Sequence, residues 1–275
     1  MKRVLSIDWD YFINATAEQR AFLFPDGVDE NLDSELQKLC WDNHYNSSLG
    51  EQLKNIGVVK NDYETIHSIL RKFSHKNSRK EDLIQVAISH KWIYYFIMKR
   101  ISEGEEFEVY NLDFHHDMYC YKTRDEEVNC GNWVNCLLEK RPDMKYYWVK
   151  REDSETEVLG GEVDCETKRI EELQDLEFDY VFICRSDCWS PPHLDTYFES
   201  LWVLLSKFMP ISLIDRVHIH RTISELPDVQ KEYARLLPIE KDMRRYNNAT
   251  CLKCNCILPE GNPTGLFCYA CSKGE

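Results

Sequence analysis

Short apolar segments that run directly into aspartate or histidine recur along this chain, and they constrain its fold more than any other feature. They are VLSID at 4–8, LIQVAISH at 83–90, FEVYNLDFHHD at 107–117 and FDYVFICRSD at 178–187. Apolar runs of this length are typical of strands buried on both faces of a sheet. MKYYWV at 144–149 predicts one further strand of this kind.

Longer stretches with the apolar density of core-facing helices separate these strands. They cover residues 92–101, 131–140 and 194–208, and a polar, asparagine-rich stretch to about residue 80 is also expected to be helical. Strands that alternate with helices predict a mostly parallel sheet with helices on both faces, which is a three-layer α/β fold. We expect this catalytic domain to cover residues 1–245, with a small zinc-binding module at 246–275.

The carboxyl ends of parallel strands meet at one edge of a sheet, where ligands of open α/β proteins bind. His90, the acidic cluster that begins at Asp113, and Asp187 each follow a predicted strand. Three strands therefore bring imidazole and carboxylate groups to the same edge. This arrangement predicts a metal site.

Asp113, His115 and Asp117 form a DxHxD pattern. In an extended chain residues two apart point to the same side, so three ligands can converge from five residues. Mixed imidazole and carboxylate ligands suit Mn, Fe or Zn, and the lack of thiolates in this cluster argues against a structural zinc there. The alternative interpretation is a solvated acidic loop with an incidental histidine.

The motif NLDFHHD, preceded by ISHKW and followed by RSDCWSPP, resembles the arginase-like (ureohydrolase) family. The GNW sequence at Gly131, Asn132 and Trp133 is similar to a divergent branch of that family, which includes peptide arginases. Those enzymes convert arginine in ribosomal peptides to ornithine and urea. The resemblance implies an arginase/deacetylase-like fold, two catalytic Mn2+ ions, and an arginine-containing peptide as substrate.

The resemblance also implies roles for individual residues. His90 and Asp117 would bind one ion, His115 the other, Asp113 both, and Asp187 would be a further ligand. Arginases place two aspartates two residues apart at this last position, whereas the chain has Arg185, Ser186 and Asp187. A carboxylate is therefore missing, and Asp8 or Asp10 could supply it or bind the substrate cation.

We expect Asp10 in particular to face the site, because it lies further along the chain than Asp8. Arginases carry a proton-shuttle histidine after DxHxD, but the matching stretch GNWVNC has none. His116, Tyr119 and His193 are the candidates to replace it.

Cysteines near the end of the chain form a second motif. Cys251, Cys254, Cys268 and Cys271 make two CxxC pairs separated by thirteen residues. This spacing matches a structural Zn2+ held by four thiolates, and Cys256 is a spare thiol. So small a module lacks a core of its own, so metal binding should provide most of its folding energy.

Charge and hydropathy narrow the class of protein. A formal net charge of −14 argues against binding to nucleic acids and favours a cationic substrate. The chain has no apolar stretch long enough to span a bilayer, so we expect a cytoplasmic protein without membrane contact. Two alternatives to an arginase-type hydrolase remain: a zinc-dependent deacylase of the same fold, against which Asp117 argues, and a non-catalytic binding scaffold.

Overall fold

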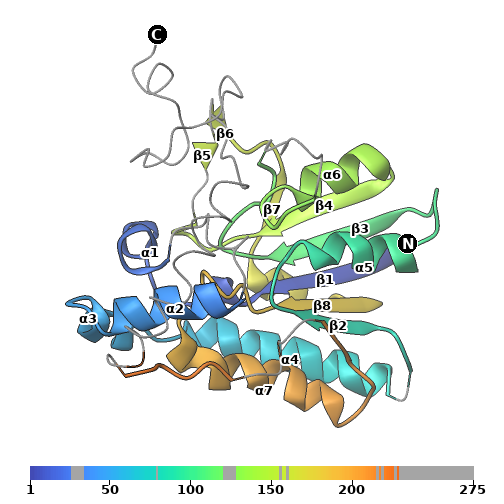
Figure 1. Cartoon of the computed structure of the whole chain (residues 1–275). Coiled ribbons are helices and arrows are strands. Elements are labelled where there is room, and N and C mark those ends of the chain that lie inside the picture. The colour runs from blue at the N-terminus through green and yellow to red at the C-terminus, as the bar shows by residue number, and fades with distance from the viewer. Residues whose placement is uncertain are drawn as a thin grey trace.

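Seven parallel strands form the central sheet of the protein (Figure 1). This computed structural model describes residues 1–25, 34–78, 80–119, 128–154, 157–158, 161–214, 217, 220–225 and 228. The strands of the sheet are β1 (Lys2–Asp8), β2 (Ile84–Ala87), β3 (Phe107–Leu112), β4 (Met144–Val149), β7 (Glu166–Lys168), β8 (Tyr180–Cys184) and β9 (Ser212–Leu213). Their order across the sheet is β7-β4-β3-β1-β8-β2-β9, so β1 lies at the centre.

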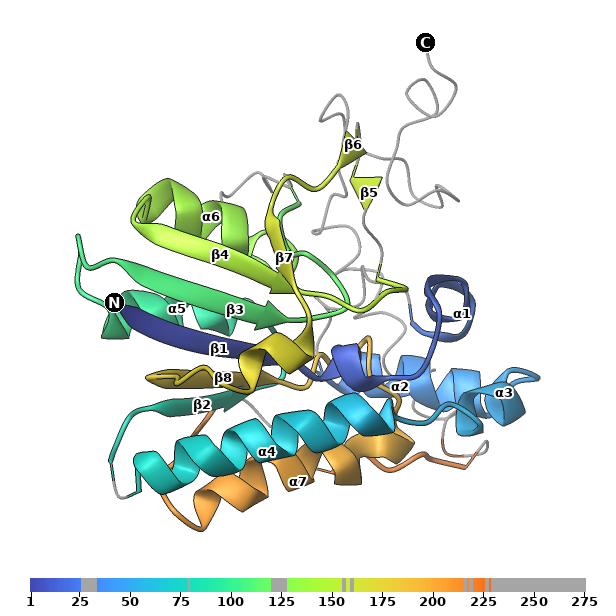
Figure 2. The same ribbon diagram turned by 180° about the vertical axis from the view of Figure 1, so that it is seen from behind.

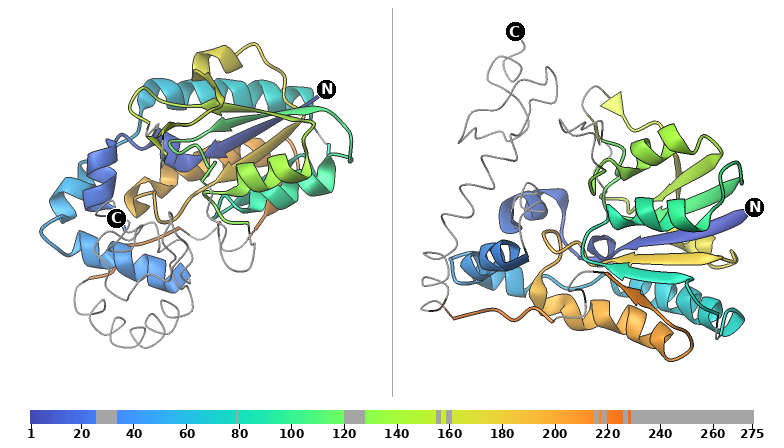
Figure 3. Two further views of the ribbon diagram at one scale, coloured as in Figure 1. Left: turned by 90° about the horizontal axis from the view of Figure 1, so that it is seen from above. Right: turned by 45° about the vertical axis from the view of Figure 1, so that its right-hand side comes forward.

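Helices cover both faces of this sheet. On one face lie α4 (Lys60–Lys76) and α7 (Asp195–Ser206), with the short helix η3 (Ile170–Leu173) (Figure 2). On the other face lie α5 (Trp92–Arg100) and α6 (Trp133–Lys140) (Figure 3). The predicted α/β fold with a parallel sheet between two helical layers is confirmed.

Alternating residues of the central strands explain why the protein has two cores. Leu5 and Ile7 of β1 belong to the core under α4 and α7, whereas Val4 belongs to the core under α5 and α6. In β8, Val181 and Phe182 divide in the same way. Because successive side chains of a strand point to opposite faces, a strand buried on both faces is apolar throughout.

The first part of the polar stretch, up to residue 54, folds beyond the carboxyl ends of the strands, whereas α4 lies along the sheet (Figure 1). This first part contains η1 (Trp9–Phe12), α1 (Ala17–Leu23), α2 (Ser34–Tyr45) and α3 (Gly50–Lys54) before α4 begins. A capping box starts α1, since Thr16 accepts from the Gln19 N–H and the Gln19 side chain accepts from the Thr16 N–H. The expected helices are present, and those before α4 lie at the edge of the sheet where the metal site was predicted.

The sequence did not predict the shortest strands. β7 and β9 contain three and two residues, and β5 (Glu157–Val158) pairs with β6 (Gly161–Glu162) in a separate hairpin. Such short or exposed segments carry no hydrophobic period. The zinc-binding module at 246–275, with Cys251, Cys254, Cys268 and Cys271, lies outside the described residues. Among the described residues, no helix combines the length and the apolar character that crossing a membrane requires.

Candidate metal centre

Four neighbouring strands, β3, β1, β8 and β2, end at the same edge and deliver the residues of the candidate site. Asp8 is the last residue of β1, Asp113 follows β3 directly, and His90 lies three residues after β2. Adjacent strands are about 4.8 Å apart, so side chains at their ends can meet. They form two groups that could each hold a metal ion.

The first group surrounds Nδ1 of His90. This atom lies 3.2 Å from Oδ2 of Asp8, 3.1 Å from Oδ2 of Asp113 and 2.9 Å from Oδ2 of Asp117. All four side chains are buried. Nε2 of His90 is 2.7 Å from the Ser6 hydroxyl, an interaction that orients the ring and leaves Nδ1 facing the carboxylates.

The second group consists of Asp10, Asp113 and His115. Nδ1 of His115 lies 2.9 Å from Oδ2 of Asp10 and 3.8 Å from Oδ1 of Asp113. Asp10 is buried, whereas 16% of the His115 side chain is exposed. The second group therefore lies closer to solvent than the first.

Asp113 joins the two groups through its separate oxygens. Oδ2 faces His90 and Oδ1 faces His115. The expected contact of Asp113 with both ions remains a prediction, and each of its oxygens lies beside one of the two histidines. A carboxylate shared in this way is the element that a two-metal site requires.

The residues fit a metal ion by two criteria. Ligand atoms around an ion at about 2.1 Å are about 3 Å apart, close to the separations around His90. In addition, Nδ1 of His90 and Oδ2 of Asp10 are buried and lie close to ion-pair partners, yet neither makes a hydrogen bond of good geometry among the described residues. Such atoms are costly to bury unless something binds them. Each group contains one of them.

Hydrogen bonds from neighbouring side chains hold the carboxylates in place. Ser186 donates to Oδ2 of Asp8 at 2.5 Å, and the amide of Asn111 donates to Oδ2 of Asp113 at 3.2 Å. The buried Arg20 guanidinium donates to the Asp10 carbonyl at 2.8 Å and lies 3.5 Å from the Asp10 carboxylate. The ligand set is therefore fixed from several sides, as partners of metal ligands usually are.

Electrostatic interactions within the site shift the proton affinities of its members. Burial, with Asp10 and Asp113 nearby, raises the pKa of Asp8 to about 6. Burial and Asp117 raise the pKa of Asp113 well above its usual range. Burial opposes protonation of His115, yet Asp10 outweighs it and raises the pKa of His115 to about 9. The clustered carboxylates thus favour extra positive charge, which protons or metal ions can supply.

Backbone strain also concentrates here. Among the described residues other than glycine, three have φ in the left-handed region, and two of them belong to this site: Asp117 with φ 54° and Ser186 with φ 50°. Such conformations persist where surrounding contacts impose them, and they are common at functional sites.

The structure places Asp187, expected as a further metal ligand, among arginine side chains. Both of its carboxylate oxygens accept hydrogen bonds from Arg185, at 2.5 and 3.0 Å, and Arg221 lies 3.8 Å away. Although burial opposes it, Arg221 and Arg185 lower the pKa of Asp187. Asp187 therefore stays outside both groups and anchors an ion-pair network. Asp8 joins the first group and Asp10 the second.

The candidate proton donors differ in how many of their ring nitrogens already have a hydrogen-bond partner. Both ring nitrogens of His193 have partners, the Ile56 carbonyl at 2.8 Å and the Tyr45 hydroxyl, which leaves neither nitrogen available for a proton transfer in this structure. His116 accepts from the Met118 N–H through Nδ1, and its ring lies against Tyr119 with centroids 4.2 Å apart. Burial and His115 lower the pKa of His116 to about 4, so this histidine is neutral near pH 7.

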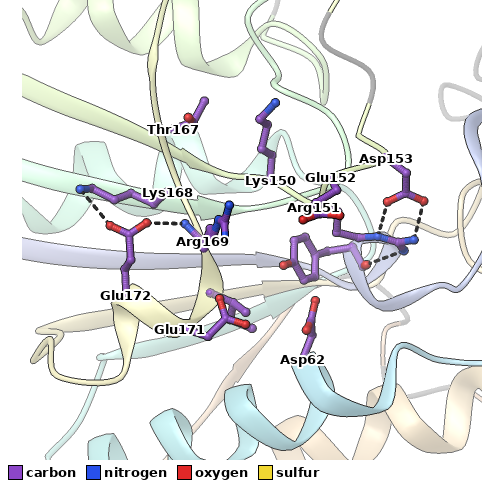
Figure 4. A pocket seen from close by; sticks show the side chains of 12 residues that line it. Asp62, Lys150, Arg151, Glu152, Asp153, Thr167, Lys168, Arg169, Glu171 and Glu172 are labelled. Atoms are coloured by element: carbon purple, nitrogen blue, oxygen red, sulfur yellow. Dashed lines mark hydrogen bonds and ion pairs between the residues drawn. The ribbon is translucent and has the colours of Figure 1, made fainter.

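An open cavity of about 660 Å³ lies beside this edge, and none of its lining residues belongs to either group (Figure 4). It is strongly polar, and several of its charges pair with each other, such as Arg151 with Asp153 and Lys168 with Glu172. Arg151 also donates to the carbonyls of Tyr11 and Ile13, at 3.2 and 2.5 Å. The cavity wall is thus continuous with the segment that carries Asp10, but the ligand-like chemistry lies in the buried groups.

Sequence reasoning left several supporting residues unidentified. Ser6 carried a weak signal, because a polar residue interrupts a buried strand two positions before Asp8. Arg20 and Ser186 carried no signal in the sequence, since only tertiary contacts bring them to the site.

Comparison of the chain with protein-family models, curated proteins and solved structures gives no match.

Proposed function

We propose that this chain is a dinuclear metal-dependent hydrolase that cleaves the guanidino group of a peptide arginine to give ornithine and urea. The observation that carries the proposal is the position of Asp113, whose two oxygens face two separate histidine-containing groups. Such a carboxylate can hold two ions at the short separation that two-metal hydrolysis uses.

The donor set supports a hard or borderline divalent metal. Each group offers one imidazole and at least two carboxylates, and neither includes a thiolate. Manganese is the metal that the arginase resemblance implies, and imidazole with carboxylate suits it. Asp8, Asp10, Asp113 and Asp117 would together balance the charge of two divalent ions, which offsets much of the cost of burying these charges.

When bound, two such ions would supply a nucleophile by lowering the pKa of water toward neutrality. Substrate would approach from the side of His115, the ligand residue with the greatest exposure. The half-buried Trp189 lies on that side, with its ring centroid 4.8 Å from that of His115. An aromatic face beside the site suits a planar cation such as guanidinium. His116 would transfer a proton through Nε2, which has no partner among the described residues.

A urea assay on the manganese-loaded protein tests the proposal. An arginyl peptide, free arginine and an acetyl-lysyl peptide serve as substrates, and the last of these tests for a deacylase. We expect urea from the arginyl peptide, none from the Asp113→Asn variant, and normal release from Glu64→Gln, which changes an exposed carboxylate on α4. Acetate from the acetyl-lysyl peptide, or no product from any substrate, would contradict the proposal.

A further inference from the structure

We propose that Trp133, the first residue of α6 after the Gly131–Asn132 turn, is a positioning residue that orients Asp117 toward the ion of the first group. The inference rests on the metal centre of the proposed function. It gives a role to the GNW motif, which the proposed function does not use. Its evidence is a set of contacts between the turn and the end of the DxHxD segment.

Trp133 contacts two members of the first group. Its indole N–H donates to Oδ2 of Asp117 at 2.5 Å, and this is the oxygen that lies 2.9 Å from Nδ1 of His90. The indole ring also lies against the His90 ring, with centroids 5.3 Å apart and planes inclined by 49°. Trp133 is fully buried, so water does not compete for the hydrogen bond.

The preceding turn and the first residues of α6 hold the backbone around Asp117. The Tyr119 N–H donates to the Gly131 carbonyl at 2.9 Å, and the Asn135 amide donates to the Met118 carbonyl at 2.6 Å. A Cβ at Gly131 would lie 3.1 Å from the Tyr119 ring, so glycine allows this close approach. These contacts stabilise the left-handed conformation of Asp117.

The indole hydrogen bond has a specific consequence for the ligand. It fixes the rotation of the Asp117 carboxylate, so that Oδ2 is directed at the position where an ion would lie beside His90. Without it, the carboxylate would be free to turn away. Loss of a partner that orients a metal ligand typically reduces metal affinity about 10- to 100-fold. The effect should be confined to the first group, because the hydrogen bond of Trp133 goes to Asp117 and not to Asp10 or His115.

Calorimetric titration of the metal-free full chain with Mn2+ tests this inference. Trp133→Phe keeps a ring but removes the N–H, and we expect one of the two ions to bind about 10- to 100-fold more weakly while the other is retained. Trp41→Phe is the matched control, because it also removes a buried indole hydrogen bond, to the Asp187 carbonyl at 2.7 Å. This control should bind both ions as the wild type does.

The outcomes separate this inference from the proposed function. If the wild type binds two ions and Trp133→Phe binds them equally well, or loses both to the same extent, the role of Trp133 is wrong while the metal centre stands. If the wild type binds no metal, both proposals fail. Should Trp133→Phe not fold, benzothienylalanine at position 133 replaces the indole N–H by sulfur at nearly constant shape, and the same selective weakening is expected.

Discussion

Oδ2 of Asp8 lies 3.2 Å from Nδ1 of His90, although their strands, β1 and β2, are separated in the sheet by β8. The strand between them contributes no carboxylate to the groups. It contributes Ser186, whose hydroxyl donates to Asp8. Asp8, and not Asp187, therefore lies where a ligand of the first ion would be needed.

Replacing Asp8 by asparagine should weaken binding of the first ion at nearly constant shape. Loss of a residue that only supports a ligand costs about 10- to 100-fold in metal affinity, so loss of the ligand charge should cost at least about 100-fold. Metal analysis after dialysis against a fixed Mn2+ concentration measures the change. Unchanged manganese content would remove Asp8 from the ligand set.

The matched variant Asp187→Asn should affect stability instead. It weakens a buried ion pair with Arg185 and Arg221, and breaking such a pair costs about 3 to 5 kcal/mol. We expect a lower free energy of unfolding in denaturant titrations, with manganese stoichiometry unchanged once the protein is folded. Loss of one ion without loss of stability would show that Asp187 is a ligand after all.

Manganese affinity should rise with pH. Asp10 raises the pKa of His115 to about 9, so near pH 7 this histidine holds a proton that must leave before Nδ1 can bind an ion. For each proton displaced, apparent affinity increases about tenfold per pH unit, and this contribution ends above the pKa of the histidine. Titrations between pH 6.5 and 9 in buffers of different ionisation enthalpy would count the protons released.

Asp10→Asn provides the control for this pH dependence. Without the Asp10 carboxylate, the pKa of His115 should fall toward its ordinary value. The slope above about pH 6.5 should then decrease by about one displaced proton, while His90 still contributes, because, despite burial, Asp117 and its other carboxylate neighbours raise its pKa well above the ordinary value. The variant also loses a ligand, so the slope and not the absolute affinity is compared. An identical slope in both proteins would show that His115 does not supply the displaced proton.

Much of the fold and part of the site could be predicted from local patterns. The apolar runs at 4–8 and 178–187 specified buried parallel strands, and a polar residue at the end of each specified the edge of the site. What local patterns could not specify was the direction of a side chain after the strand ends. Asp187 points to Arg185 and Arg221, and only the tertiary position of the 220–225 segment brings Arg221 there.

Cys254→Ser should leave the manganese centre intact. The thiolates at 251–271 and the groups around His90 come from separate segments, so a structural Zn2+ and the catalytic ions should be lost independently. Elemental analysis of the variant should show one zinc fewer per chain and unchanged manganese. Loss of manganese as well would show that the tail supports the catalytic centre.

The electron paramagnetic resonance spectrum of the protein loaded with two equivalents of Mn2+ tests the central claim most directly. Asp113 shared between His90 and His115 would hold two ions about 3.5 to 4 Å apart, close enough for their spins to couple. We expect a coupled dinuclear spectrum that is lost in Asp113→Ala. A six-line spectrum of isolated, protein-bound Mn2+ at full loading would contradict it.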